Sequence, residues 1–378
     1  MLKNTESPGA LLIPSIEALR ALACLMVVYC HIVGRPIVIF KESWPPATLV
    51  NDFIITPLGI IKNFGFLGVG LFFLISGFIV THTGLNETRF SFFIKRIFRI
   101  YPALLITVGA TLWLATQAAA AGMTDGAIGI GYSNAWLAAL GMEAGISKKL
   151  LLDVSWTISI ELFFYAHMLA LLPLLKTRPI FSIVLLIGWS ILLAQLNKLA
   201  PEFPRTISHM AAYLPIFAIG AVIYFYWSSR ITLSKTAALA ALTWIALIIN
   251  LTATRSDKLA ALNSHTTQIA YALFIFLSAL WLYQARAINN QAAVRFFANI
   301  SYSLYLIHLP FSVAITAFLY PKIGLSGAIL VSFAVSVVLA YSLYRLIEIP
   351  GQRIGRKLLS LNSRRLIGLV KKARPSTE

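Results

Sequence analysis

The stretch RALACLMVVYCH, residues 20–31, consists of mostly apolar residues between an arginine and a histidine. It lies in an apolar run over residues 16–39, and about 20 apolar residues is the length of an α-helix that crosses a bilayer. Such runs recur along the 378-residue chain, which is 59% hydrophobic and 12% charged. An average soluble domain has about twice that charged fraction. The runs lack the period-two alternation of a barrel strand, so the sequence predicts an all-α polytopic membrane protein.

The basic residues indicate how the spans are oriented. With the N-terminus in the cytoplasm, 19 Lys and Arg residues fall on the cytoplasmic side, 9 on the other side, and 3 within or at the edge of spans. Because cytoplasmic loops are enriched in Lys and Arg, we expect both termini in the cytoplasm and an even number of crossings. The ten expected transmembrane helices are 16–39, 66–84, 101–121, 155–175, 180–196, 209–228, 236–252, 267–285, 301–320 and 325–347.

We expect residues 1–350 to form a transmembrane domain and residues 351–378 to form a basic cytoplasmic tail. The tail mixes basic residues with Leu, Ile and Val, which is typical of a helix on an anionic membrane surface; simple disorder is the alternative. The net charge of +18 does not indicate nucleic acid, because the excess lies beside membrane spans. Cys24 and Cys30 face about 120° apart on one helix, so we expect no disulfide and no metal site.

Arg20 and His31 are the first candidates for function, because ionisable groups inside a membrane are costly and commonly functional. Eleven residues of helix place them about 16 Å apart and within about 20° of one face. Arg20 would lie at the cytoplasmic boundary, as an anchor or as a ligand of the substrate. His31 would lie near the middle, as a hydrogen bond between helices or as a general base for a hydroxyl.

The stretch SWTISIELFFYAH, residues 155–167, places Glu161 inside another apolar span. Ser155 and Tyr165 are polar neighbours, and Tyr165 lies one turn beyond Glu161 on the same face. A buried carboxylate needs a partner. Glu161 is therefore either half of an ion pair that locks helix packing, or a residue that orients His31 or the substrate.

The stretch KRIFRIYP, residues 95–102, puts Lys95, Arg96 and Arg99 at the cytoplasmic start of the third expected span. Clusters of this kind commonly anchor topology. They also suit phosphate groups, which accept charge-assisted hydrogen bonds.

Further signals come from helix breaks and small residues. His308 and Glu348 each stand two residues before a proline, next to a break in the regular helical hydrogen bonds. The stretch FFLISGF, residues 72–78, contains the small pair Ser76 and Gly77, which lets a helix or a ligand approach closely.

Taken in order, these stretches resemble the membrane-bound acyltransferase 3 family, the bacterial O-acyltransferases of sugars and exopolysaccharides. The resemblance covers nearly the whole chain. Longer members append an extracytoplasmic esterase-like domain, and this chain resembles the stand-alone type. The motifs that carry the resemblance are Arg20-x10-His31, FFLISGF, KRIFRIYP, SWTISIE..FY, SYSLYLIH and RLIEIPG.

The resemblance implies transfer of an acyl group, usually acetyl, from acyl-CoA on the cytoplasmic side of a bacterial inner membrane to a hydroxyl of a saccharide or its lipid-linked precursor. It implies His31 as the catalytic residue, as general base or transient acyl carrier, with Arg20 and Glu161 beside it. A thioester is already activated, so we expect no metal. The residues expected to hold the acyl-CoA phosphates are Lys95, Arg96 and Arg99, and those expected to contact substrate are Ser155, Trp156, Tyr165 and His308.

Two other classes of function would also fit parts of this sequence. A secondary transporter also uses ionisable residues near the membrane midplane, but the sequence contains no internal repeat and its cytoplasmic charge is clustered. An inactive scaffold for polysaccharide assembly would keep the family resemblance, but Arg20, His31 and Glu161 are all in place. The sequence therefore favours the acyltransferase.

Overall fold

The computed structural model describes residues 13–120, 135–142, 150–254, 258–284 and 291–373. Every regular element in these ranges is a helix, and nine of the helices found there are long and apolar enough to cross a membrane. Large apolar side chains such as Trp113 and Phe274 are exposed, as a lipid-facing surface requires. A helix pairs its own backbone N–H and C=O groups, and this is needed in a bilayer because lipid tails offer these groups no hydrogen-bonding partner. The predicted all-α polytopic membrane fold is confirmed.

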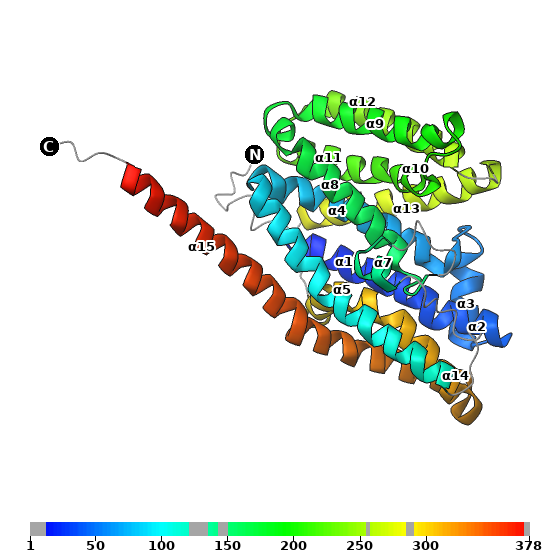
Figure 1. Cartoon of the computed structure of the whole chain (residues 1–378). Coiled ribbons are helices and arrows are strands. Elements are labelled where there is room, and N and C mark those ends of the chain that lie inside the picture. The colour runs from blue at the N-terminus through cyan, green and yellow to red at the C-terminus, as the bar shows by residue number, and fades with distance from the viewer. Residues whose placement is uncertain (1–12, 121–134, 143–149, 255–257, 285–290, 374–378) are drawn as a thin grey trace.

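The helices follow one another along the chain as shown in Figure 1. Their bounds are α1 (Ile13–Tyr29), η1 (Cys30–Gly34), α2 (Arg35–Phe40), α3 (Pro45–Val50), η2 (Asn51–Ile55), η3 (Lys62–Phe64), α4 (Gly65–Leu85), α5 (Arg89–Ala120), α7 (Ala135–Ala139), α8 (Ser155–Thr177), α9 (Pro179–Leu199), α10 (Arg205–Ala211), α11 (Leu214–Trp227), α12 (Leu233–Thr254), α13 (Lys258–Gln284), α14 (Ala292–Leu343), η5 (Tyr344–Glu348) and α15 (Ile349–Ala373).

The last long apolar segment, Ala292–Leu361, begins with α14 and contains two of the ten expected spans. Its backbone is non-helical at Gly324, with φ 69° and ψ 176°, a conformation that favours glycine. Thr316 and Ser332 share a hydrogen bond of 2.8 Å between their hydroxyls, although sixteen residues of straight helix would separate them by about 24 Å. The chain therefore turns back on itself at Gly324. Eight single helices and the two arms of this hairpin account for the ten expected spans.

Helix α4 lies at the centre of the bundle, and most of its residues are buried. It crosses α11 at very short range: a Cβ on Gly77 would lie 2.0 Å from the carbonyl oxygen of Phe217, and a Cβ on Gly220 would lie 2.2 Å from that of Leu74. The predicted close approach at Gly77 is therefore an approach between two helices. The adjacent Ser76 points about 100° around the helix from Gly77.

The tail forms helix α15, which continues the second arm of the hairpin through η5. Its first turns pack on α5, because Gly351 and Gly355 lie against Pro102 and Phe98. Figure 1 shows the rest of α15 extending away from the bundle. The placement of α15 on a membrane surface and of both termini in the cytoplasm stay predictions, and residues 1–12 and 374–378 lie outside the described ranges.

Candidate active site

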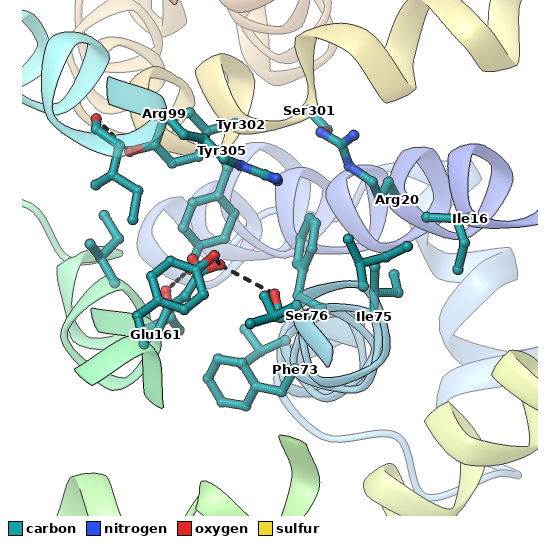
Figure 2. A pocket seen from close by; sticks show the side chains of 18 of the residues that line it. Ile16, Arg20, Phe73, Ile75, Ser76, Arg99, Glu161, Ser301, Tyr302 and Tyr305 are labelled. Carbon is teal, nitrogen blue, oxygen red and sulfur yellow. Dashed lines mark hydrogen bonds between the residues drawn. The ribbon is translucent and has the colours of Figure 1, made fainter. Parts of the chain in front are cut away.

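A cavity of about 290 Å³ lies between α1, α4, α5, α8 and α14 (Figure 2). One wall is apolar, with Phe72, Phe73 and Ile75 of α4. Polar groups from all five helices line the rest of the cavity. These polar side chains are Glu17, Arg20, Ser76, His82, Arg99, Thr157, Glu161, Tyr165, Ser301, Tyr302 and Tyr305.

A second cavity of about 430 Å³ adjoins the first at the end of the bundle that carries the basic cluster. Two side chains, Arg20 and Arg99, line both cavities. The second cavity also contains four further cationic or acidic side chains and several polar ones. Its other lining residues are Lys95, Arg96, Phe98, Asn299, Tyr344, Glu348, Gln352, Gly355 and Arg356.

The two shared arginines are free to bind an anion. Arg20 donates from Nη2 to Ser301 Oγ at 2.9 Å. Across the described ranges, neither Arg20 nor Arg99 has a carboxylate oxygen within 4 Å; the ion pairs found there are Arg35–Asp153 and Lys95–Glu87. A guanidinium has five N–H donors, so most donors of both arginines remain available where the cavities meet.

The predicted phosphate cluster divides into two parts. Lys95 pairs with Glu87 at 2.9 Å, and Arg96 donates from Nη2 to Thr83 Oγ1 at 2.6 Å. Both contacts join α5 to the end of α4 and the turn after it, so these two residues also hold the helices together. Arg99 makes no such contact among the described side chains and points into the first cavity in Figure 2.

Glu161 belongs to a hydrogen-bonded cluster on the wall of the first cavity. Its Oε1 accepts from Ser76 Oγ at 3.2 Å and from the Tyr165 hydroxyl, as the dashed lines in Figure 2 show. Within the described part of the chain no cation lies within ion-pair distance of Glu161, so the ion-pair interpretation is wrong. Glu161 does not contact His31 either. Glu161 lines the first cavity, and its role in orienting a substrate stays a prediction.

His31 is joined to His308, which the sequence had placed among the substrate contacts. The His31 Nδ1 and His308 Nε2 atoms are 2.9 Å apart, with ring planes inclined by 29°. His308 is fully buried, and its Nδ1 lies 2.8 Å from the Leu304 carbonyl oxygen. The expected hydrogen bond between helices at His31 is therefore confirmed. His31 lies in the π-helical turn η1, and such turns are frequent at functional sites.

Tyr305 separates the histidine pair from the first cavity. Its side chain lines the cavity, its hydroxyl shares a hydrogen bond with Thr157, and its ring centroid is 6.1 Å from that of His308. Neither His31 nor His308 lines this cavity. The histidine pair therefore lies one side chain beyond the cavity's inner end.

The prediction that Arg20 and His31 share one helix face is confirmed by their common partner. Both contact the first arm of α14, Arg20 at Ser301 and His31 two turns later at His308. The two contacts occur in the same order along both helices, so α1 and this arm run parallel. These two helices are the first and the ninth of the ten expected spans. Odd-numbered spans cross the membrane in the same direction, so the parallel arrangement agrees with the expected topology.

Two of the predicted substrate contacts lie away from both cavities. Ser155 is buried, and its carbonyl oxygen accepts a hydrogen bond from Ser159. Trp156 packs toward Tyr213, with ring centroids 5.9 Å apart. Neither Ser155 nor Trp156 lines either of these cavities, whereas Tyr165 lines the first.

Several site residues were not singled out from the sequence, although helical spacing could have found some of them. Thr157 precedes Glu161 by one turn, and Ser301 and Tyr305 fall on the face of α14 that carries His308. Glu348 was noted only for its proline; it is buried and accepts from Ser303 Oγ at 2.8 Å. Among the described residues no three His, Cys, Asp or Glu side chains gather as a metal site.

Fold and cavities together define a multi-pass membrane protein with two adjoining polar cavities, the second of which is lined by several basic side chains. The family model of acyltransferase 3, described as an acyltransferase domain, matches residues 13–345. The chain belongs to this family. No solved structure gives a significant match.

Relatives of this chain include proteins of Staphylococcus aureus and Komagataeibacter xylinus. "Putative O-acetyltransferase SACOL0978" of Staphylococcus aureus strain COL is 24% identical over 92% of this chain and 58% of its own length. Its counterpart SAR0937 in strain MRSA252 is 24% identical over 93% and 59%. "Putative membrane-bound transacylase BcsY" of Komagataeibacter xylinus is 33% identical over 30% of this chain and 33% of its own length. The chain thus spans under three fifths of the staphylococcal relatives.

Proposed function

We propose that this protein is an O-acyltransferase of the bacterial inner membrane, which moves an acyl group from acyl-CoA to a hydroxyl of a cell-surface saccharide or its lipid-linked precursor. The acyl group is acetyl in the simplest case. Membership of the acyltransferase 3 family and the names of the staphylococcal relatives support the reaction class. The family match also favours this function over a transporter.

The observation that carries the proposal is the position of Arg20 and Arg99, which line both cavities. The phosphates of coenzyme A would occupy the basic second cavity and bind these guanidinium groups together with Lys95 and Arg96. The pantetheine arm is long and mostly neutral, so it suits the first cavity with its apolar wall of α4. Its thioester would then approach Tyr305 and the histidine pair.

The acceptor would enter from the opposite end of the bundle. Arg35 and Asp153 form a partly exposed ion pair of 2.8 Å there, one turn beyond His31. In this mechanism His31 takes the proton of the acceptor hydroxyl while that oxygen attacks the thioester carbonyl. The C–S bond then breaks, and the proton leaves with the coenzyme A thiolate. Transient acylation of His31 before the acceptor arrives uses the same groups.

The test is transfer of label from radioactive acetyl-CoA to surface saccharide in membranes that contain wild-type or His31→Ala protein. Loss of the general base is expected to lower transfer by about 10²- to 10⁴-fold. His167→Ala is the matched control, because His167 also lies in an apolar span but contacts neither cavity. Mass spectrometry of the product identifies the acceptor. Full activity of His31→Ala would refute the mechanism, and absence of transfer by wild type from acetyl- or succinyl-CoA would refute the function.

A further inference from the structure

The histidine pair ends on a backbone carbonyl, and this fixes where its protons lie. A carbonyl oxygen can only accept, so the Nδ1 of His308, 2.8 Å from Leu304 O, must carry a proton. His308 is fully buried, and no carboxylate among the described residues bonds to its ring. An unpaired imidazolium in such a place is very costly. His308 is therefore neutral, and its Nε2 is a lone-pair acceptor.

The second bond then fixes the tautomer of His31. Because His308 Nε2 accepts, the proton in the 2.9 Å contact belongs to His31 Nδ1. A neutral His31 must consequently carry its lone pair on Nε2. The small inclination of 29° between the rings lets the N–H and the lone pair lie near one common plane, as a linear hydrogen bond requires.

We infer that His308 is a positioning residue for acyl transfer, which holds His31 in the tautomer and orientation that present Nε2 to the proton of the acceptor hydroxyl. This inference rests on the proposed function for its catalytic meaning. When His31 takes the proton at Nε2, its Nδ1–H remains bonded to His308, so the new positive charge keeps a hydrogen-bonding partner. Without His308 the ring of His31 is free to turn and to place its proton on either nitrogen.

Three variants separate positioning from general structural support. His308→Leu removes the acceptor of the His31 proton, whereas His308→Gln keeps one in its amide oxygen. His167→Leu is the matched control: its Nδ1 also bonds a carbonyl one turn earlier, that of Phe163 at 2.8 Å, and no second histidine bonds to it. We expect kcat to fall about 10- to 100-fold in His308→Leu, the loss typical when a partner that orients a metal-bound histidine is removed. His308→Gln and His167→Leu should retain most activity, and KM for acetyl-CoA should stay unchanged in all three.

The second readout does not depend on activity. Nitrogen-15 NMR of histidine-labelled protein in lipid, with the His31 signals assigned from His31→Ala, reports which ring nitrogen carries the proton. In wild type we expect a protonated Nδ1 and an unprotonated Nε2 on His31, and a mixture in His308→Leu.

The outcomes distinguish the inference from the function on which it rests. A wild type without transferase activity that shows the expected tautomer would refute the function alone. An active wild type with the proton of His31 on Nε2, or a His308→Leu variant as active as His167→Leu, would overturn the inference. If His308→Leu does not fold, the wild-type spectrum and the activity of His308→Gln still decide.

Discussion

At the scale of single residues, Arg99 is the cation on which the proposed binding of acyl-CoA would depend most directly. The N–H groups of Arg99 form no ion pair with a carboxylate among the described residues, and its side chain lines both cavities. A hydrogen bond to a charged group contributes about 1.5–3 kcal/mol. We therefore expect Arg99→Ala to weaken acetyl-CoA binding about 10- to 100-fold, measured by titration of the purified protein in lipid nanodiscs.

The control for Arg99→Ala is Arg89→Ala on the same helix. Arg89 is exposed and donates to the Ala170 carbonyl oxygen at 2.9 Å, so the two variants lose the same charge at different places. Arg89→Ala should leave affinity unchanged. Equal losses in both variants would mean that only net charge matters and that Arg99 does not touch the donor.

Individual candidate residues can be predicted from the sequence where one ionisable group interrupts an otherwise apolar span. Arg20, His31 and Glu161 were singled out in this way, and Arg99 was singled out as part of a basic cluster. Of their partners, Ser76, Tyr165 and His308 were also singled out, but Ser301 was not, because serine is common in apolar helices and Ser301 gives no signal of its own. The pairing of His31 with His308 depends on the packing of α1 on α14, which no local pattern encodes.

At the scale of helices, the crossing of α4 and α11 limits what Gly77 can become. A methyl group there would lie 2.0 Å from Phe217 O, whereas at Gly70 it would lie 3.5 Å from Ala272 Cβ, an ordinary contact. Overpacking costs about 1–3 kcal/mol or more, and backbone cannot move aside as a side chain can. We expect Gly77→Ala to lower the thermal unfolding temperature in detergent and Gly70→Ala to leave it nearly unchanged. Equal unfolding temperatures in the two variants would contradict this crossing.

Span positions were predicted to within a few residues where a helix ends at a polar turn. Residues 155–175 and 180–196 correspond to Ser155–Thr177 and Pro179–Leu199. The third span differs more, because α5 begins at Arg89 and carries the basic cluster inside the helix. The π-helical turns at His31 and Glu348 were not predicted, since their wider hydrogen-bonding pattern leaves no periodic trace in sequence.

At the scale of the whole molecule, the hairpin at Gly324 makes the number of crossings even. An even number of crossings puts both ends of the bundle's chain on the same side of the membrane. With ten crossings, the exposed Lys41 should face outward and the exposed Lys357 should face the cytoplasm. Single Lys41→Cys and Lys357→Cys variants, made without Cys24 and Cys30, can be treated with a membrane-impermeant maleimide in spheroplasts. We expect labelling of the first and protection of the second until the membrane is lysed. Labelling of both in sealed spheroplasts would contradict the topology.

The second cavity takes its walls from the two ends of the described chain: Arg20 comes from the first span, and Glu348, Gln352 and Arg356 follow the last. The proposed site for the acyl-CoA phosphates would therefore be complete only after the chain has been synthesised as far as η5 and α15 and these helices have packed against α5. Binding of the thioester would then depend on helices that leave the ribosome far apart in time.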